Sequence, residues 1–403
     1  MNLLFVIPEM SMGGAQRSVD KISTALALNH NVWIVVFNRT HVVAKASQKQ
    51  LLSLEVSSGS GAFVKMRAFA LRVIRLRALK RKLNIDVSIS FLEGADYINV
   101  LSASQEKVIL SIRGSKVHDE NMHRSGFEFR RWLIRFLYKK AHAIVCVNKG
   151  IAREMTEYYG IKNVPVSTIY NFYDIPEARL LAGKPLPQAV MNLYNCQTIV
   201  MSGRIAREKG HRFVVKLFAE LKKQVQHVKL LVVGDGPDKD ILVSLAESLH
   251  LSVAYTVNEL ARQPDPDLFI TGDQENVFSY LKHGTIYVLN SSSEGFPNGL
   301  AEAMICGLPV VAADCPYGPR EILCQTPEMK ELTDIEFADY GVLLPMPGEE
   351  PSASIFDCWM QAILQLLSSE QLRLGYSNKG SDRMEGFTGE KIVKMWRQIV
   401  EGE

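Results

Sequence analysis

Residues 293–315 are Ser-Glu-Gly-Phe-Pro-Asn-Gly-Leu-Ala-Glu-Ala-Met-Ile-Cys-Gly-Leu-Pro-Val-Val-Ala-Ala-Asp-Cys. They follow the apolar run Thr285–Asn290, which predicts a strand. The segment itself predicts a glycine-containing loop, a helix over Asn298–Cys306 and a second strand over Pro309–Ala312. Two apolar strands joined by a helix are typical of a parallel sheet that is covered on both faces.

The same alternation of short apolar strands and helical patterns occurs throughout the chain, with a restart near residue 198. Helices are predicted over Gln16–Leu28, Gly210–Val225, Lys239–Leu249, Ser354–Leu367 and Lys391–Val400. Further strands are predicted over Leu3–Pro8, Val32–Phe37, Asp86–Phe91, Lys107–Ile112, Ala143–Val147, Val166–Tyr170, Thr198–Ser202, Lys229–Val233, Asp267–Ile270 and Gly341–Leu344.

We therefore predict an α/β fold of two Rossmann-like, doubly wound domains, because 403 residues are many for one hydrophobic core. The domains are expected over residues 1–175 and 196–385, with a linker over 176–195. Residues 386–403 are expected to form a C-terminal helix that can pack back on the N-terminal domain. Two such domains facing each other place ligands at the carboxyl ends of the strands, in the cleft between them.

Composition indicates a cytoplasmic globular protein, with 47% apolar and 22% charged residues. The apolar runs are too short to span a bilayer, and Met1–Pro8 lacks the basic region and cleavage site of a signal peptide. The six cysteines show neither paired nor metal-ligand spacing, which favours reduced thiols.

Charge is distributed unevenly along the chain. Residues 1–185 contain 27 Lys and Arg against 14 Asp and Glu, a net of +13, and the remainder contains 19 against 29, a net of −10. The first half therefore either meets an anionic partner or is simply solvated. Two basic stretches with interleaved apolar residues, Lys65–Lys82 and Arg124–Lys140, favour an anionic membrane surface, or else domain helices with basic outer faces. Nucleic acid is disfavoured because no recognition module accompanies the charge.

The loop and helix at residues 293–306 predict a phosphate site. Asn298 can cap the helix, which leaves the amides of Gly299 and Leu300 as unpaired donors at its positive end. Glu294 in the loop and Glu302 in the helix reach the same cleft, where carboxylates can accept hydrogen bonds from hydroxyls such as those of a ribose. The alternative is that both glutamates serve only capping and solvation.

One further motif follows the first strand of each half. Ser202-Gly-Arg-Ile-Ala-Arg-Glu-Lys-Gly210 places Arg204 and Lys209 beyond a strand end, where two cations can neutralise a diphosphate leaving group. An exposed basic turn is the alternative. Gly13-Gly14 follows the first strand, and its small residues allow a ligand to approach the backbone.

Together these motifs resemble the retaining family 4 glycosyltransferases of the GT-B fold, and Asp314-Cys-Pro-Tyr-Gly-Pro-Arg-Glu-Ile resembles their bacterial polysaccharide-assembly branch. The resemblance covers most of the chain. It includes Met1–Gln16, Asn171–Asp174, Gly203–Gly210, Val232–Gly236 and Ser291–Leu323.

The resemblance implies a role for each matching residue. Arg204 and Lys209 would hold the donor diphosphate, Glu302 the donor ribose and Glu294 hydroxyls of the donor sugar. Catalysis would depend on Glu294, Arg204 and Lys209. The remaining donor-binding residues would be Gly13 and Gly14 of the facing loop, with Gly295, Phe296, Pro297, Asn298, Gly299 and Leu300 around the sugar and its phosphate.

One position departs from the family pattern. Relatives often carry a histidine after the strand that ends at Ile112, whereas this chain has Arg113-Gly-Ser. On the acceptor side, Arg113 is expected to contact a phosphate or a sugar hydroxyl, and His118 is a candidate substitute for the histidine. The irregular segment Leu251–Gly272 leaves the nucleobase slot unplaced.

No metal and no cofactor is predicted. Asp265-Pro-Asp267 matches the Asp-x-Asp metal motif of another glycosyltransferase fold, but Pro264 and Pro266 indicate a structural turn before a strand. No cluster of His or Cys suggests a metal either.

The predicted activity is transfer, with retention, of a hexose or N-acetylhexosamine from a nucleotide diphosphate sugar, with UDP as the favoured nucleotide. The acceptor would be a saccharide or a polyprenyl-diphosphate-linked saccharide, at the inner face of the cytoplasmic membrane. A GT-B nucleotide-sugar 2-epimerase and a non-catalytic sugar-nucleotide-binding paralogue remain alternatives. A dinucleotide oxidoreductase is disfavoured, because Gly-x-Gly-x-x-Gly is absent after the first strand and Phe37-Asn38-Arg39 follows the second.

Overall fold

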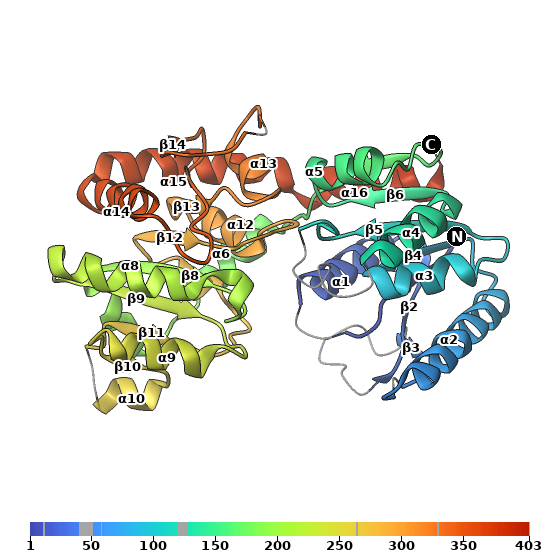
Figure 1. The fold of residues 1–403 in the computed structure, drawn as a ribbon, viewed down its shortest axis with the longest axis horizontal. Helices are drawn as coiled ribbons and strands as arrows, with labels where there is room; N and C mark the ends of the chain where they lie inside the picture. Colours follow the sequence, from blue (N-terminus) through green and yellow to red (C-terminus); the bar gives the residue numbers. More distant parts are fainter. Residues whose placement is uncertain are drawn as a thin grey trace. The chain divides into compact units, whose positions relative to one another are not determined.

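The computed structural model describes residues 1–10, 13–39, 51–57, 59–118, 127–262, 265–328 and 330–402 (Figure 1). The chain divides into two compact units. Unit 1 contains Met1–Asn171 and Gly389–Glu403, and unit 2 contains Phe172–Thr388. Both are α/β units built on a central sheet, as the sequence predicts.

The sheet of unit 1 has seven strands in the order β3-β2-β1-β4-β5-β6-β7, and all of its pairings are parallel in the described residues. The strand order changes direction between β1 and β4, so ligands are expected beyond the carboxyl ends of these two strands. The strands are β1 Asn2–Val6, β2 Asn31–Val36, β3 Leu51–Ser53, β4 Val87–Phe91, β5 Lys107–Ile112, β6 Ala143–Cys146 and β7 Val166–Thr168. The helices are α1 Gly14–Leu26, α2 Ala62–Lys82, α3 Glu93–Leu101, α4 Phe127–Leu137, α5 Lys149–Arg153 and α16 Gly389–Glu401.

The sheet of unit 2 has eight strands in the order β10-β11-β9-β8-β12-β13-β15-β14, and only the short β14 runs antiparallel among the described pairings. Its order changes direction between β8 and β12. The strands are β8 Gln197–Ser202, β9 Val228–Val233, β10 Val253–Ala254, β11 Leu268–Ile270, β12 Ile286–Leu289, β13 Val310–Ala313, β14 Glu336–Phe337 and β15 Val342–Leu344. The helices are α6 Ile175–Ala182, α7 Gln188–Met191, α8 His211–Gln224, α9 Lys239–Ser248, α10 Val257–Arg262, α11 Phe278–Leu281, α12 Asn298–Ile305, α13 Pro319–Leu323, α14 Ala353–Ser368 and α15 Glu370–Met384.

The unit boundaries differ from the predicted domain boundaries. Residues 176–195, for which we predicted a linker, contain most of α6, all of α7 and a following 3₁₀ turn, and belong to unit 2. The reason is local: the Asp174 side chain accepts from Glu177 N at 2.9 Å and caps α6, and a proline stands in the first turn of that helix. At the other end α16 belongs to unit 1, where Lys107 Nζ donates to Ile399 O at 2.6 Å.

Several cations of the first predicted basic stretch, Lys65–Lys82, contact other residues of unit 1. Lys80 of α2 is buried and pairs with Glu106 at 2.7 Å, and burial lowers the pKa of Lys80 to about 8 despite that partner. Arg72 donates to Val56 O at 2.9 Å and Arg75 donates to Leu54 O at 2.6 Å. Lys80, Arg72 and Arg75 therefore hold α2 against its neighbours rather than form a free basic face. In the described residues, no helix combines the length and apolarity needed to cross a membrane.

Candidate donor site

The carboxyl ends of β8 and β12, where the strand order of unit 2 changes direction, bring two of the sequence motifs together. Ser292 N donates to Glu208 O at 2.8 Å, and Asn290 Nδ2 donates to Gly210 O at 3.1 Å. Lys209 Nζ lies 2.5 Å from Glu294 Oε1. These contacts join the loop after β8 to the loop after β12 at the place where a doubly wound sheet binds ligands.

Glu294 and Lys209 form a partly buried ion pair. The hydroxyl of Ser291 donates to the same Glu294 oxygen at 2.7 Å. Burial lowers the pKa of Lys209, but the facing Glu294 carboxylate outweighs burial and the net shift is upward. Lys209 is therefore a fixed positive charge in this loop cluster at neutral pH.

Gly210 makes the close approach of the two loops possible. Its φ is +65°, in the left-handed region, and a Cβ there would lie 2.0 Å from Asn290 O. A larger residue would be strained by its own backbone and would push the loops apart. The glycine after Lys209 is thus required by the packing around that lysine.

Helix α12 begins beside these loops, although its cap differs from the prediction. The N-cap is Pro297, not Asn298, and no side chain caps the helix. Asn298 instead accepts from the Tyr173 hydroxyl at 2.6 Å, because Tyr173 of the same unit reaches this side chain. A Cβ on Gly299 would lie 2.3 Å from Tyr287 Oη and 2.6 Å from Ser202 Oγ, so the first turn packs against the ends of β12 and β8.

The other predicted donor residues of unit 2 divide into buried and exposed positions. Phe296 and Leu300 are buried and anchor the loop and helix, so only their backbones can meet a ligand. Glu302 is buried on α12. The Arg204 side chain is 66% exposed and pairs with Glu208, whereas Lys209 pairs with Glu294. The two predicted phosphate-binding cations therefore differ in exposure and in the carboxylate with which each pairs.

In unit 1, Arg113 lies near the predicted glycine loop. Gly13 is the N-cap of α1 and Gly14 is its first residue. The Arg113 guanidinium donates to Ser18 of α1 at 3.1 Å and also to Asn171. Ser18 in turn donates to Gly14 O at 3.0 Å. Arg113, which follows β5, and the start of α1, which follows β1, are thus joined at the carboxyl edge of the sheet.

His118 lies after β5 and is the last described residue before residue 119. Its backbone N donates to the Ser115 hydroxyl at 2.9 Å, and Ser115 itself donates to the buried Glu154 at 2.6 Å. Residues 119–126, which follow it, lie outside the described residues. The structure thus fixes the backbone of this loop through Glu154, a residue that sequence reasoning missed.

The Asp265-Pro-Asp267 turn precedes β11, at the amino ends of the strands. Asp265 pairs with Lys229 and Asp267 pairs with Lys222, each at 2.6 Å. Both carboxylates are therefore held in ion pairs at the edge of the sheet opposite Lys209. Pro264, part of the same prediction, lies outside the described residues, within which no group of three His, Cys, Asp or Glu could hold a metal.

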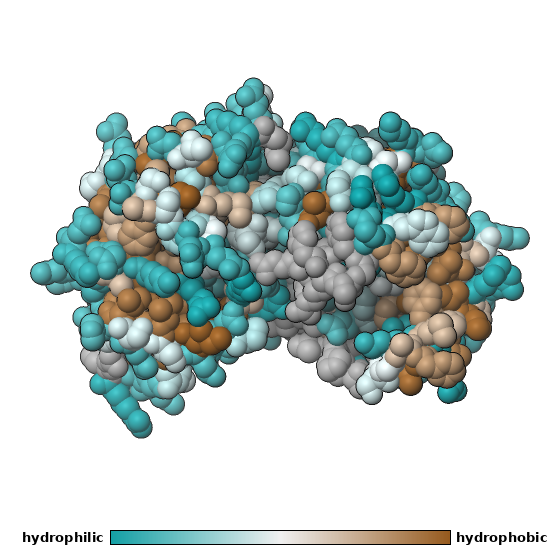
Figure 2. All heavy atoms as spheres, in the orientation of Figure 1, coloured by the Kyte–Doolittle hydropathy of each residue, from teal (hydrophilic) through white to brown (hydrophobic). Residues whose placement is uncertain are grey.

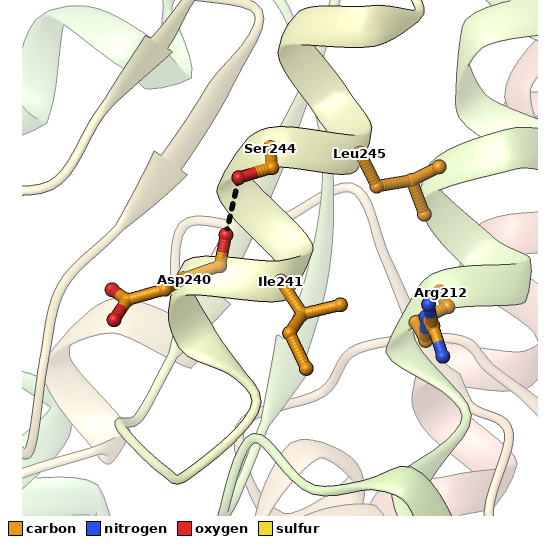
Figure 3. A pocket seen from close by; sticks show the side chains of 5 residues that line it. All are labelled: Arg212, Asp240, Ile241, Ser244 and Leu245. Carbon is orange, nitrogen blue, oxygen red and sulfur yellow. Dashed lines mark hydrogen bonds between the residues drawn. The ribbon is translucent and has the colours of Figure 1, made fainter.

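A separate open groove of about 450 Å³ lies on the outside of unit 2 (Figure 3). Arg212 of α8 faces Asp240, Ile241, Ser244 and Leu245 of α9 across it. The Ser244 hydroxyl donates to Asp240 O at 2.9 Å within the same helix. The groove contains no predicted site residue and separates two surface helices.

Comparisons with known proteins identify the family. A model described as Glycosyltransferase Family 4 matches residues 12–176, and one described as Glycosyl transferases group 1 matches residues 196–335. The chain belongs to glycosyltransferase family 4. It is therefore an enzyme, and the predicted class, a hexosyltransferase, agrees with relatives that are named glycosyltransferases.

Two relatives show how far the similarity extends. An uncharacterized glycosyltransferase of Methanocaldococcus jannaschii is 28% identical over 281 residues, which are 66% of this chain and just under two thirds, 65%, of the relative. The N-acetylgalactosamine-N,N'-diacetylbacillosaminyl-diphospho-undecaprenol 4-alpha-N-acetylgalactosaminyltransferase of Campylobacter jejuni is 25% identical over 392 residues, or 96% of each chain.

Solved structures confirm the fold of this family 4 chain. Anabaena HepE in complex with UDP has a TM-score of 0.75 at 15% identity over all of both chains. WaaG, a glycosyltransferase involved in lipopolysaccharide biosynthesis, has a TM-score of 0.70, also at 15% identity and full coverage. The predicted GT-B class is thus confirmed.

Three residues around the donor site were not predicted from the sequence. Ser291 contacts Glu294, Tyr173 contacts Asn298, and Ser202 lies under Gly299. Ser202 is the last residue of a predicted strand and Ser291 directly follows one, so their place at a strand end was available as a signal. Tyr173 stands 125 residues before its partner, and no local pattern joins the two.

Proposed function

We propose that this family 4 glycosyltransferase is a retaining enzyme that moves a hexose or N-acetylhexosamine from a UDP-sugar to a saccharide acceptor in cell-surface polysaccharide synthesis. The observation that carries the proposal is the Lys209–Glu294 pair beside the start of α12. It combines a cation for a diphosphate, a carboxylate for sugar hydroxyls and backbone N–H groups at a helix N-terminus. UDP is favoured because HepE and the pneumococcal O-GlcNAc transferase GtfA are both described in complex with it.

The proposed mechanism is front-face displacement. The acceptor hydroxyl attacks the anomeric carbon on the face from which the diphosphate leaves, and the departing phosphate oxygen takes the hydroxyl proton. The bond to the diphosphate breaks as negative charge grows on its oxygen. Lys209 and Arg204 stabilise that charge, so their contribution is larger in the transition state than in the bound donor.

The acceptor is proposed to be a saccharide carried on a polyprenyl diphosphate. The Campylobacter relative is named for a diphospho-undecaprenol-linked substrate. Arg113 beside the first turn of α1 offers unit 1 a cation for such an acceptor. His118 is retained as a second acceptor-side candidate.

A nucleotide-sugar panel tests the proposal. We expect UDP-sugars to raise the melting temperature more than GDP- or ADP-sugars, and the anomeric coupling constant of the product to show retention. Formation of a 2-epimer without an acceptor would instead identify a nucleotide-sugar 2-epimerase. Binding without any turnover would contradict the proposed transfer.

Metal independence is the next prediction. Because side-chain cations are proposed to neutralise the diphosphate, an excess of EDTA should leave turnover close to that of untreated enzyme. The measurement is UDP release before and after chelation. Loss of activity that manganese or magnesium restores would contradict this assignment.

We also propose peripheral attachment of unit 1 to the anionic inner face of the cytoplasmic membrane. Phe129, Trp132 and Phe136 of α4 are 63%, 56% and 50% exposed, and their rings stack in a row at 6.1 and 5.4 Å. Figure 2 shows apolar side chains gathered over the part of unit 1 that contains α2 and α4. Exposed aromatic rings among cations are typical of surfaces that lie at a membrane interface. Residues 124–126 of the predicted stretch lie outside the described residues.

Liposome sedimentation tests the attachment. Replacing the exposed cations Lys65, Arg67, Arg77 and Lys139 with glutamine should reduce pelleting with anionic vesicles, because each cation near the surface is worth about 1 kcal/mol. Salt at ~1 M should act in the same direction.

A second pair of variants separates apolar insertion from charge. Trp132→Ser should reduce pelleting, whereas Leu374→Ser, an equally exposed position in unit 2, should not. Wild-type protein that ignores anionic vesicles at low salt would contradict attachment and favour a soluble acceptor.

A further inference from the structure

The turn at residues 314–318 packs directly against the loop that carries Glu294. Asp314 follows β13, and Gly318 ends the turn before α13. A Cβ on Gly318 would lie 2.9 Å from Pro297 Cδ, 3.2 Å from Glu294 Cβ and 3.3 Å from Gly295 O. The turn therefore supports the donor loop, and no space remains between them for a side chain.

The backbone of this turn is held in an unfavourable conformation. Tyr317 has φ +66° and Gly318 has φ +70°, so two consecutive residues have a positive φ. For a bulky residue such as Tyr317 this conformation is costly, and it persists only where the surrounding structure imposes it. Some contact must therefore hold the turn in place.

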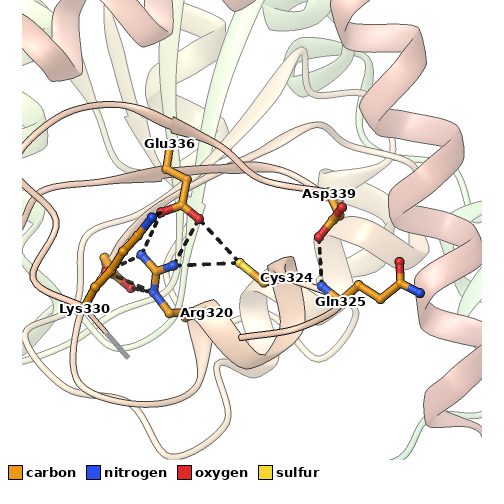
Figure 4. A network of polar contacts seen from close by, with 7 residues as sticks. Arg320, Cys324, Gln325, Lys330, Glu336 and Asp339 are labelled. Atoms are coloured by element: carbon orange, nitrogen blue, oxygen red, sulfur yellow. Dashed lines mark hydrogen bonds and ion pairs between the residues drawn. The ribbon is translucent and has the colours of Figure 1, made fainter. Parts of the chain in front are cut away.

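Arg320 supplies one such contact, through Asp314 at the start of the turn (Figure 4). This buried guanidinium donates to Asp314 through Nε at 3.0 Å and through Nη2 at 2.7 Å. Its Nη1 and Nη2 each donate to Glu336 of β14 at 3.0 Å. Burial lowers the pKa of Arg320, but the two carboxylates outweigh burial and the net shift is upward.

The two carboxylates connect Arg320 to different parts of unit 2. Asp314 begins the turn that touches the donor loop, whereas Glu336 lies on the edge strand and also pairs with Lys330 at 2.9 Å. Asp314 therefore links Arg320 to Glu294, and Glu336 links it to the rim of the sheet. Of the two contacts of this guanidinium, the one with Asp314 can affect the donor site. The one with Glu336 serves as the control.

We propose that Arg320 is a positioning residue of the donor site: through Asp314 it holds the 314–318 turn against Pro297 and Glu294, and so sets where the Glu294 carboxylate meets the donor sugar. This inference rests on the proposed function for the identity of the ligand. Arg320 itself touches neither donor nor acceptor in this scheme. A displacement of about 1 Å at a reacting centre can cost about 100-fold in rate, so even a small shift of the turn is measurable.

The test compares Asp314→Asn with Glu336→Gln, which each remove one charged partner of the same arginine. Hydrogen exchange across residues 292–300, UDP affinity by calorimetry, UDP release from a UDP-sugar and melting temperature are measured for both. We expect Asp314→Asn to speed exchange in that segment and lower kcat by about 10- to 100-fold, with UDP affinity near wild type. Glu336→Gln is expected to lower only the melting temperature.

A third variant, Gly318→Ala, acts on the turn without touching the ion pairs. It should also speed exchange in residues 292–300 and lower kcat, because its methyl group meets Pro297 and Glu294. The positioning role is overturned if exchange in this segment is unchanged in both Asp314→Asn and Gly318→Ala, or if Glu336→Gln changes it equally. If wild-type protein binds no UDP, the proposed function fails, while the exchange pattern still decides whether Arg320 holds the loop.

Discussion

Replacing Lys209 with alanine is expected to lower kcat/KM for sugar transfer by about 10- to 1,000-fold, a loss of ~1.4–4 kcal/mol of transition-state stabilisation. The reason is the position of its ammonium group, which lies in the loop after β8, is fixed 2.5 Å from Glu294 and is kept charged by that carboxylate. Steady-state kinetics on folded protein is the measurement. Arg204→Ala should change kcat/KM in the same direction.

Arg207 provides the matched control for both variants. It lies in the same 3₁₀ turn as Lys209, but its exposed side chain pairs with Glu349 instead of the donor loop. Arg207→Ala should therefore leave kcat/KM near wild type. Near-wild-type turnover in both Arg204→Ala and Lys209→Ala would show that the two cations do not stabilise the leaving diphosphate.

The second large expected effect distinguishes the role of Glu294 from that of Glu302. Glu294→Gln should lower kcat by about 10- to 1,000-fold while UDP still binds, because this side chain pairs with Lys209 and is assigned to the donor sugar. Glu302→Gln should mainly weaken UDP binding, by roughly 10-fold, the value of one charge-assisted hydrogen bond of about 1.5 kcal/mol to a ribose hydroxyl. Calorimetric titration with UDP, paired with kinetics, measures both effects.

Glu247→Gln, an exposed carboxylate of α9, controls for the loss of one negative charge. It should change neither UDP affinity nor kcat. Equal loss of UDP affinity in Glu294→Gln and Glu302→Gln would reject the division between sugar and ribose. Unchanged UDP affinity in Glu302→Gln would remove the ribose assignment alone.

The sheets were predictable because their strands are continuous apolar runs. β5 was predicted with the bounds that the structure shows, and β9 within one residue, since such runs need no distant information to be recognised as buried strands. β3, β10 and β14 were missed because two or three residues are too few to show a period. α6 was missed although Asp174 and Pro176 form a standard helix start, because the surrounding prolines and glycines were interpreted as a linker.

The donor-site residues were predictable by type, but their partners were not. Asn298 has the composition of a helix cap, yet Tyr173 reaches it and Pro297 takes the cap position. Arg72 and Arg75 belong to a basic stretch, yet they donate to backbone carbonyls 16 and 21 residues earlier. Arg113 could be placed at a strand end, but its contact with Ser18 lies across 95 residues of chain.

The amino-acid sequence alone determines most of the longer strands and helices, and which charged residues follow a strand, because both depend on local pattern. Only the tertiary structure decides that Lys209 and Glu294, 85 residues apart, share one ion pair, and that Arg320 is joined through Asp314 to the turn that packs against the Glu294 loop. Such pairings follow from strand order, which reverses between β8 and β12. Strand order is a property of how the whole sheet packs, and no run of neighbouring residues contains it.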